Sequence, residues 1–546
     1  MKRFLTFFLI FALIFTCGCA AGTPEETVPT VYDTTGKYPL DTTRNEAIVT
    51  GSGTALDNST NSRVFYHIFV GSFSDSNNDG VGDLRGIIDR FDYINDGDPN
   101  SGLSLGAEGI WLSPIFTSPS YHKYDAANYY EIDPDFGTME DLQELIELCH
   151  ERGVKIILDL VINHSSPQNP WFQEFVKAQK ENDTESEYYD LYTWSEAGEP
   201  GRTWYPIAGT DKLYEGNFSS EMPELNFDGD AAKEKMVELA KYYLDMGIDG
   251  FRFDAAKYIY YGETTRNYEF WDWYMGELRA IKPDVYTVAE VWDSDGVTIP
   301  YFSSTNCFNF SMAQTAGQIS QTAKGGDVNT FTAYVENYIS QIQSYRAEAA
   351  PVTFIANHDT DRAAGFLPVS NGQAKVAANL SILMPGSTFI YYGEEIGLKG
   401  SRGGSNTDAN RRLAMLWGDG DTISDPEGAD YSSEQVNGTV QDHLPNGDSL
   451  YSHYKKLIHI RKSNPEIASG TYKALKLEGT YLGGFISTLD GSSVVVLHNT
   501  TTEAVQIDLS TLEVSVTGIV DFAGMGDASL EGTLLTIAPQ TSVVLK

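Results

Sequence analysis

From about residue 62 to residue 460, the chain alternates short apolar runs with longer segments in which apolar residues recur every three or four positions. The run 154–162 is almost continuously apolar, which is typical of a parallel strand buried on both faces. Segment 139–152 has helical spacing, with Thr138 as an N-cap candidate and Gly153 as its stop. Because this order of strand and helix repeats, the sequence predicts an α/β fold, a parallel barrel with its site at the strand carboxyl ends.

Two parts of the chain depart from that repeat. The interval between Asp159 and Asp254 is too long for one strand–helix unit, so we place an insertion at 166–226. This stretch is rich in Trp, Tyr, Pro and Gly, as expected of an elaborated loop near a site. After about residue 464 the pattern changes to short alternating runs, which predict an antiparallel β domain. The expected domains are therefore a barrel at 62–165 and 227–463, an insertion at 166–226 and a β domain at 464–546.

The first 61 residues do not fit a packed domain. Residues 1–19 have two cations followed by an apolar run too short to span a bilayer comfortably, which predicts an export signal. The stretch Thr16-Cys-Gly-Cys19 looks like a bacterial lipoprotein cleavage box, and residues 20–61 predict a flexible tether. We expect an exported protein anchored through lipid at Cys19 to the outer face of a bacterial membrane. Simple secretion after cleavage near Ala20 or Ala21 stays open.

Charge and cysteine usage narrow the classes of partner. The formal net charge of −39 argues against nucleic acid and is compatible with a neutral ligand such as a polysaccharide, although acidity also keeps a secreted protein soluble. Outside the export segment only Cys149 and Cys307 occur, so the sequence predicts two buried thiols and no disulfide framework or cysteine-rich metal cluster.

Carboxylates follow several of the predicted strands. Asp254 ends the run Gly250-Phe-Arg-Phe-Asp254, where Arg252 is placed to keep it ionised. Glu290 follows the apolar run 285–289, and Asp359 follows the run 352–356. A ring of carboxylates at strand ends is what the cleavage of a glycosidic bond requires, with one as nucleophile and one as acid.

With these motifs in their order, the chain resembles the α-amylase family of glycoside hydrolases (family 13) over about residues 62–546. The resemblance implies a (β/α)8 TIM barrel, a B domain inserted after the third strand and a C-terminal antiparallel β-sandwich. Asp254 then matches the family nucleophile, Glu290 the acid/base and Asp359 the third carboxylate. The form of Met222-Pro-Glu-Leu-Asn226 is similar to the group between oligo-1,6-glucosidases and neopullulanases, and to some bacterial α-amylases.

The resemblance also implies residues that bind the sugar. Tyr124 would stack on a pyranose ring, and Asp159 would support Arg252. Lys257 matches a residue on the aglycone side, although a solvated surface lysine fits its position as well. The full expected set is His122, Tyr124, Asp125, His164, Arg252, Lys257, His358 and Arg362. Asp125 and Arg362 resemble a pair that grips the non-reducing end in exo-glucosidases, but endo-acting relatives carry such residues too.

A second motif predicts a structural calcium ion. The stretch Asp75-Ser-Asn-Asn-Asp-Gly-Val-Gly-Asp83 places oxygen side chains at alternate positions, an arrangement that wraps oxygens around a hard cation. No glutamate stands at its twelfth position, so it departs from a helix–loop–helix calcium hand. The expected ligands are Asp75, Asn77, Asp79, Val81 through its carbonyl, and Asp83. Asn163 matches a ligand of the family's other calcium, but Tyr258 stands where many members have a histidine, so that second site stays open.

The favoured hypothesis is a retaining, endo-acting α-amylase that cleaves α-1,4-glucosidic bonds of starch and maltooligosaccharides, and that acts as a monomer. The alternatives within the class are an exo-acting α-glucosidase or oligo-1,6-glucosidase, a neopullulanase and a transglycosylase. A glycan-binding lipoprotein or transporter subunit without activity is the alternative from another class, and the presence of all three carboxylates argues against it.

Overall fold

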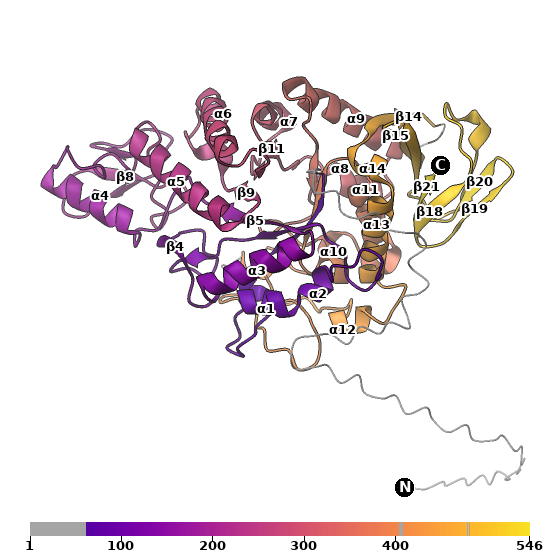
Figure 1. The fold of residues 1–546 in the computed structure, drawn as a ribbon, viewed down its shortest axis with the longest axis horizontal. Coiled ribbons are helices and arrows are strands. Elements are labelled where there is room, and N and C mark those ends of the chain that lie inside the picture. Colours follow the sequence, from indigo (N-terminus) through magenta and orange to yellow (C-terminus); the bar gives the residue numbers. More distant parts are fainter. Residues whose placement is uncertain (1–61, 403–407, 478, 480) are drawn as a thin grey trace, which may run out of the picture.

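The computed structural model describes residues 62–402, 408–477, 479 and 481–546 (Figure 1). The predicted export signal, the tether and the lipid attachment at Cys19 lie outside the described residues. In the described part of the chain, every helix is too short or too polar to cross a membrane.

Eight parallel strands form the centre of the molecule, in the order β11-β10-β9-β5-β2-β1-β13-β12. Their bounds are β1 Val64–Ile68, β2 Gly109–Leu112, β5 Lys155–Leu160, β9 Gly250–Phe253, β10 Tyr286–Ala289, β11 Asn306–Cys307, β12 Val352–Phe354 and β13 Ser387–Tyr391. A parallel bridge between Phe308 and Val352 joins the two edges, so the sheet closes into a barrel. The predicted fold class is thus confirmed.

Helices surround the barrel, and the predicted helix at 139–152 is one of them. Thr138 and Asp141 form a capping box at its start, with the Thr138 hydroxyl accepting from the Asp141 amide and the Asp141 carboxylate accepting from the Thr138 amide. The α-helices outside the insertion are α1 Leu84–Asp89, α2 Phe91–Ile94, α3 Met139–Glu151, α5 Asp230–Met246, α6 Thr264–Ile281, α7 Asp295–Thr298, α8 Gln318–Ala323, α9 Val328–Tyr345, α10 Ala363–Phe366, α11 Gln373–Ile382, α12 Val440–His443, α13 Leu450–Ser463 and α14 Pro465–Ser469.

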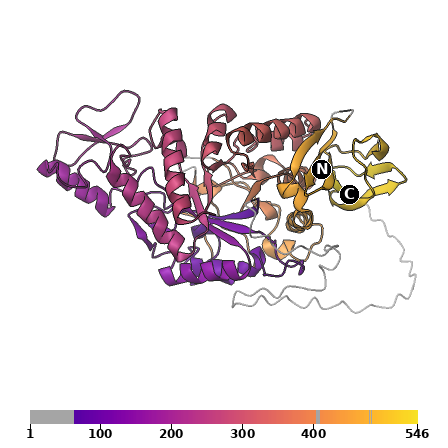
Figure 2. The same ribbon diagram turned by 45° about the horizontal axis from the view of Figure 1, so that its top comes forward.

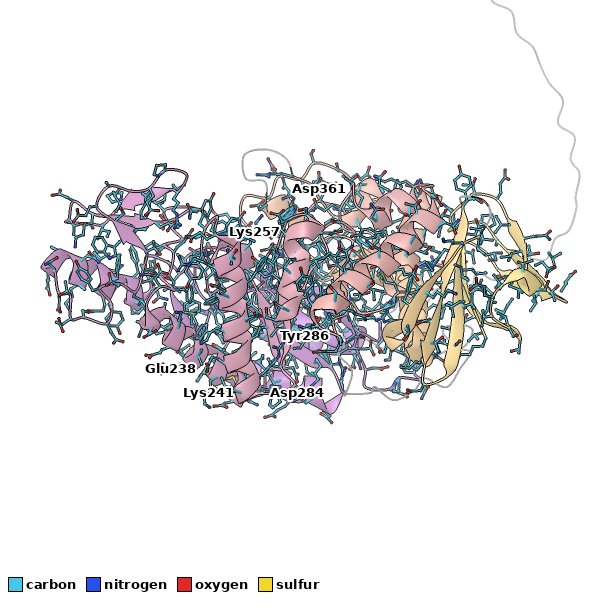
Figure 3. All side chains as sticks on the ribbon, turned by 90° about the horizontal axis from the view of Figure 1, so that it is seen from above. Glu238, Lys241, Lys257, Asp284, Tyr286 and Asp361 are labelled. Atoms are coloured by element: carbon cyan, nitrogen blue, oxygen red, sulfur yellow. The ribbon has the colours of Figure 1, made fainter. Side chains whose placement is uncertain are left out.

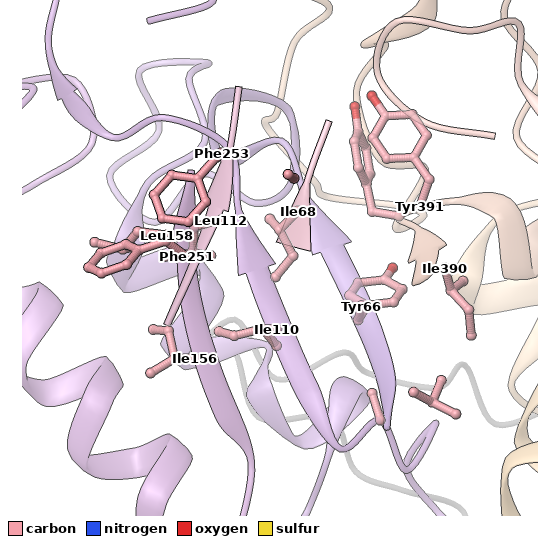
Figure 4. Packing of buried hydrophobic residues seen from close by; sticks show 14 of the residues in the cluster. Tyr66, Ile68, Ile110, Leu112, Ile156, Leu158, Phe251, Phe253, Ile390 and Tyr391 are labelled. Atoms are coloured by element: carbon pink, nitrogen blue, oxygen red, sulfur yellow. The ribbon is translucent and has the colours of Figure 1, made fainter. Parts of the chain in front are cut away.

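The core has two layers because side chains alternate along each strand. Phe65, Trp111 and Ile157 belong to the cluster that fills the barrel interior. Their neighbours on the same strands, such as Tyr66 and Ile110, belong to the larger cluster between the strands and the helices (Figure 4). The start of β9 admits only glycine, since a Cβ atom at Gly250 would lie 1.8 Å from the Tyr286 carbonyl oxygen.

Between β5 and α5 the chain leaves the barrel. It forms α4 (Pro170–Glu181) and a small antiparallel sheet of β6 (Trp194–Ser195), β8 (Leu213–Glu215) and β7 (Trp204–Pro206). A two-stranded sheet of β3 (Phe116–Thr117) and β4 (Asn128–Ile132) lies after β2 in sequence. Within this stretch, residues 166–226 are called the insertion below.

The C-terminal part is a pair of antiparallel sheets. One has the order β14-β15-β16-β21-β18 and the other β17-β20-β19, and apolar side chains from both sheets share a core. The bounds are β14 Thr471–Leu475, β15 Leu482–Leu489, β16 Ser492–Asn499, β17 Val505–Asp508, β18 Ile519–Gly524, β19 Ala528–Glu531, β20 Leu534–Ile537 and β21 Thr541–Leu545. These sheets and the insertion lie at opposite ends of the molecule (Figures 1 and 2).

Candidate active site

A cleft of about 570 Å³ lies at the carboxyl ends of the barrel strands. Its lining is His122, Tyr124, His164, Phe218, Met222, Asp254, Ala255, Tyr258, Glu290, Trp292, Asp359, Asp408 and Arg412. Figure 3 shows Lys257 and Asp361, which follow β9 and β12, at one edge of the molecule, and Asp284, which precedes β10, at the opposite edge. The strand ends thus bring the three predicted catalytic carboxylates into one cleft.

The guanidinium of Arg252 contacts two of these carboxylates. Its Nη1 donates to Oδ1 of Asp254 at 2.8 Å, and its Nη2 lies 3.1 Å from Oε2 of Glu290. Nη1 also contacts both carboxylate oxygens of Asp159, at 2.8 and 2.9 Å. Arg252 is buried, so these ion pairs are shielded from solvent. Because Asp254 and Glu290 touch one planar group, their carboxyl groups lie close together, as the cleavage of a single glycosidic bond requires.

The environment of Glu290 suits a proton donor. Burial raises the pKa of Glu290 to about 8; Arg252 opposes that shift, and the negative charges of Asp254 and Asp359 add to it. The backbone amide of Ala255 donates to Oε2 of Glu290 at 3.1 Å. Ala255 has a left-handed φ of 49°, which is unusual for a residue with a Cβ atom and occurs here directly after the Asp254 carboxylate.

Asp359 is held on both of its oxygens. Nε2 of His358 lies 3.0 Å from Oδ2, and Nη2 of Arg412 lies 2.9 Å from Oδ1. Burial works against the charge, but His358 and Arg412 hold the pKa of Asp359 well below its usual range. Near neutral pH, Asp359 is therefore an anion while Glu290 carries its proton.

Tyr124 contacts both Asp159, which pairs with Arg252, and His358, which pairs with Asp359. Its hydroxyl donates to Oδ2 of Asp159 at 2.9 Å and lies 2.7 Å from Nε2 of His358. Its ring is nearly parallel to the His358 ring, with centroids 5.4 Å apart. Tyr124 also lines the cleft, so its ring has a fixed orientation beside the space in which a sugar would lie.

Two of the predicted histidines, His122 and His164, line the cleft. Burial lowers the pKa of His122 to about 4, with Arg412 adding to the shift, and burial also lowers the pKa of His164. Nδ1 of His164 lies 3.1 Å from Oδ1 of Asn163, and its buried Nε2 has no hydrogen-bond partner in the protein. That nitrogen is therefore available to a ligand in the cleft.

Five of the eight predicted sugar-binding residues do not line the cleft. Arg252 and His358 contact its carboxylates Asp254 and Asp359, and the other three are Asp125, Lys257 and Arg362. Lys257 donates to the Trp292 carbonyl at 2.7 Å and pairs with Asp293 at 3.0 Å. Asp125 is buried and accepts from the hydroxyl of Ser118 at 2.8 Å and from that of Ser120.

Arg362 is also buried, and its Nη1 donates to the Tyr392 carbonyl at 2.6 Å. Its guanidinium lies over the rings of Tyr391 and Tyr392. Asp125 and Arg362 thus both lie outside the cleft lining, but Asp125 is 3.9 Å from Nδ1 of the lining residue His122. Nε and Nη2 of Arg362 have no hydrogen-bond partner among the described residues, and the gripping pair stays a prediction.

Several lining residues were not predicted from the sequence. Arg412 pairs with Asp359, and Trp292 stacks on Phe310 with the ring centroids 4.8 Å apart. Trp292 lies two residues after Glu290, which is a signal that could have found it. Phe218 comes from the insertion and Arg412 from the segment after β13, and nothing in their local sequence marks them. The others in this group are Met222, Ala255, Tyr258 and Asp408.

In the predicted calcium loop, aspartate and asparagine side chains accept hydrogen bonds from nearby backbone amides. Oδ1 of Asp75 accepts from the amides of Asn77 and Asn78, and its Oδ2 accepts from the amide of Gly80 at 2.9 Å and from the hydroxyl of Thr422 at 2.7 Å. Asp83 caps α1 and accepts from the amides of Ser76 and Gly86. Within the described residues, no three His, Cys, Asp or Glu side chains converge as metal ligands, so calcium at this loop stays a prediction from the sequence.

The second calcium position is bridged by protein atoms. Nδ2 of Asn163 donates to the Tyr258 carbonyl at 2.7 Å, and Oδ1 of Asn163 faces Nδ1 of His164. Two ligands of one ion would both turn oxygens toward it, whereas here the Asn163 side chain and the Tyr258 carbonyl bond to each other directly. These residues do not fit a metal ion between them.

The barrel, the cleft and its three carboxylates define a glycoside hydrolase of the α-amylase class. The family profile described as "Alpha amylase, catalytic domain" matches residues 67–470, so the chain belongs to the α-amylase family. Alpha-amylase 3 of Dictyoglomus thermophilum is 34% identical over 448 residues, covering 80% of this chain and 84% of that protein. Oligo-1,6-glucosidase of Bacillus cereus is 28% identical, covering 81% and 90%.

Solved structures agree with this assignment. Amy13B of Eubacterium rectale superposes with a TM-score of 0.83 at 31% identity, covering 91% of this chain and 97% of that one. The alpha-amylase from H. orenii superposes with a TM-score of 0.76 at 34% identity, covering 89% and 99%.

Proposed function

We propose that this protein is a retaining, endo-acting α-amylase that cleaves α-1,4-glucosidic bonds of starch and maltooligosaccharides. The observation that carries the proposal is the contact of one guanidinium, that of Arg252, with both Asp254 and Glu290. Retaining glycosidases need a nucleophile and an acid at short separation, without room for a water molecule between them.

The chemistry follows from the different environments of the two carboxyl groups. Glu290 gives its proton to the glycosidic oxygen while a carboxylate oxygen of Asp254 bonds to the anomeric carbon, and the bond to the leaving sugar breaks. Glu290, now a carboxylate, takes a proton from water, and the oxygen of that water replaces Asp254 at the anomeric carbon. Each displacement inverts the centre, so the product keeps the α configuration, and both carboxyl groups return to their starting states.

The neighbouring residues support binding in this mechanism. Asp359 and the free Nε2 of His164 face the cleft as an acceptor and a ring nitrogen for sugar hydroxyls. Phe218 and Trp292 are large exposed aromatic residues of the cleft wall, with 46% and 42% of their surfaces accessible. Aromatic faces on an open cleft suit a chain that extends past the cleavage point, which supports endo action.

Exo action is the second candidate, either as an α-glucosidase or as an oligo-1,6-glucosidase, because the relatives include a protein named oligo-1,6-glucosidase from Bacillus cereus at 28% identity. The relatives also include a protein named 4-alpha-glucanotransferase from Thermotoga neapolitana, at 28% identity. The deciding experiment is a time course of products from soluble starch, resolved by chain length, with isomaltose and pullulan as parallel substrates. Long maltooligosaccharides at early times support endo cleavage, whereas free glucose from the first minutes supports exo cleavage.

We also propose, from the sequence pattern at residues 1–61, that the enzyme works outside the cell on a lipid anchor at Cys19. We propose a structural calcium ion at Asp75–Asp83, again from the sequence pattern. Labelling of the expressed protein with a fatty-acid probe, with Cys19→Ala as control, tests the anchor.

A further inference from the structure

Arg202 lies where the insertion meets the barrel, in the segment between β6 and β7. Its Nη1 donates to both carboxylate oxygens of Glu215, at 3.1 and 3.0 Å, and Glu215 is a buried residue of β8. Its Nη2 donates to Oε1 of Glu263 at 3.2 Å and to the Tyr261 carbonyl at 3.4 Å. Tyr261 and Glu263 belong to the barrel, directly before α6. One guanidinium therefore joins an anion of the insertion to an anion of the barrel.

On the insertion side, the contact extends to the cleft wall. Oε1 of Glu215 also accepts from Nδ2 of Asn217 at 2.7 Å, and the amide of Asn217 donates to Oε1 of Glu224 at 2.9 Å. These bonds fix both ends of the segment 216–224, which we call the wall loop. Phe218 and Met222 of this loop line the cleft.

On the barrel side, the contact leads to the nucleophile. Tyr261 stacks on Tyr258, with ring centroids 5.6 Å apart, and Tyr258 lies four residues after Asp254 and lines the cleft. The Phe218 ring meets the Tyr258 ring edge to face, with centroids 5.3 Å apart. Two walls of the cleft thus touch through Phe218 and Tyr258, and Arg202 ties the segments that carry them.

Several negative side chains lie close together at this junction, and Arg202 offsets their charge. Its contacts with Glu215 and Glu263 are called the clamp below. Glu215 and Glu224 are both buried, and burial together with the charge of Glu215 raises the pKa of Glu224 to about 8. Glu199 and Glu263 lie within 3.5 and 3.2 Å of the same guanidinium. A fork-shaped cation can contact several carboxylates at once, which a point charge cannot do.

We propose that Arg202 is a positioning residue, which holds the wall loop against the β9–α6 segment and so sets the shape of the cleft for its glucan. The hydrogen bonds and ion pairs given above for Arg202 go neither to the reacting carboxyl groups nor to a lining residue, and Arg202 acts through Phe218 and Tyr258. This role rests on the proposed α-glucan hydrolase activity, but the clamp itself is a mechanical contact that can be measured without turnover.

The first test compares Arg202→Met with Arg266→Met. Arg266 pairs with the same Glu263, at 3.3 Å, and with Asp228, but it does not contact the insertion sheet. With maltohexaose as substrate, Arg202→Met is expected to raise KM about 10-fold and to change kcat less than about twofold. Arg266→Met should leave both constants near their wild-type values, and Arg202→Lys should restore part of the loss.

Glu263→Gln removes the Arg202–Glu263 ion pair and leaves the buried Glu215 paired, so it keeps the test valid if Arg202→Met does not fold. It also removes the Arg266–Glu263 pair, an effect that Arg266→Met measures separately. It should raise KM in the same direction, and the double variant should show less than the product of the two single effects. Added NaCl should raise KM of the wild type more than that of Glu263→Gln, because the Arg202–Glu263 contact is partly exposed and is screened by salt.

Hydrogen exchange separates failure of the clamp from failure of the proposed activity. In Glu263→Gln and Arg202→Met, amides of the wall loop should exchange about 10-fold faster than in the wild type, while those of β9 stay protected. Unchanged exchange and unchanged KM in folded Glu263→Gln would overturn the proposal, and so would an equal rise in KM for Arg266→Met. If the wild type turned over no α-glucan, the proposed function would be overturned. The hydrogen-exchange result would then still test whether Arg202 holds the wall loop.

Discussion

Nη2 of Arg252 lies 3.1 Å from Oε2 of Glu290, so the proposed acid is in contact with the cation that also binds the proposed nucleophile. A neighbouring cation alone would favour the ionised form of Glu290. Burial and the anions Asp254 and Asp359 outweigh it and raise the pKa of Glu290 to about 8. The same arrangement thus makes the two carboxyl groups different: Glu290 keeps its proton near neutral pH, and Asp254 accepts a hydrogen bond from the guanidinium.

The pH dependence of kcat/KM should report this difference. Glu290 must be protonated in the free enzyme, so kcat/KM should be flat near neutrality and fall about tenfold per pH unit above about 8. Initial rates on a maltooligosaccharide, with circular dichroism at each pH to confirm folding, provide the measurement. An alkaline limb near the ordinary pKa of a glutamic acid would contradict the assigned role.

Glu290→Gln should lower kcat on starch by about 10³-fold and leave KM for maltooligosaccharides within a few-fold, because the amide keeps the shape but cannot donate the required proton. A glucosyl fluoride needs little protonation of its leaving group, so its first displacement should be much less affected. Asp293→Asn, three residues further on and outside the cleft lining, is the matched control. Equal losses on starch and on the fluoride would exclude an acid role.

Arg412→Met should lower kcat/KM about 10²-fold, because it removes one of the two contacts that hold Asp359 in place. Arg411→Met is a close control, since Arg411 pairs with Asp361 and Asp408 but does not line the cleft. The measurement is kcat/KM of both variants from steady-state kinetics on a maltooligosaccharide. Similar losses in the two variants would mean that the segment, and not the Asp359 contact, is sensitive.

Trp292→Ala should raise KM for long maltooligosaccharides about 10-fold, because it removes the exposed ring that stacks on Phe310. The effect should be smaller for short substrates that do not reach this wall. Tyr345→Ala removes an exposed ring outside the cleft lining and should change nothing. A KM that rises equally for all chain lengths would place Trp292 at the cleavage point and not along the chain path.

Removal of calcium should lower Tm by several degrees, and Ca²⁺ should restore it, because an ion that binds only the folded state stabilises that state. In Asp79→Ala, neither the chelator nor added Ca²⁺ should shift Tm. Differential scanning calorimetry with and without EDTA makes the comparison. A wild type insensitive to EDTA would remove the calcium prediction, in agreement with a loop that already hydrogen-bonds its own oxygens.

The three proposed catalytic carboxylates were predictable from the sequence because strand ends are marked by local sequence signals. Asp254, Glu290 and Asp359 each follow an apolar run, and parallel strands bring their carboxyl ends to one face. The helix at 139–152 was equally readable, since a capping residue and a periodic face are both local signals. Asp125 and Arg362 are charged residues beside the same motifs, but both are buried outside the cleft lining, which only the packing of the chain shows.

By itself, the sequence determined the barrel, the order of its strand-end carboxylates and hence the family of enzymes. Only the tertiary structure decided that Arg412 and not Arg362 faces the cleft, that Phe218 and Trp292 form its walls, and that Arg202 joins the insertion to the barrel. The physical reason is the distance along the chain over which each kind of signal acts. Apolar periodicity and capping act within a few residues, whereas a contact such as Arg412 with Asp359 depends on how segments far apart in the chain pack together.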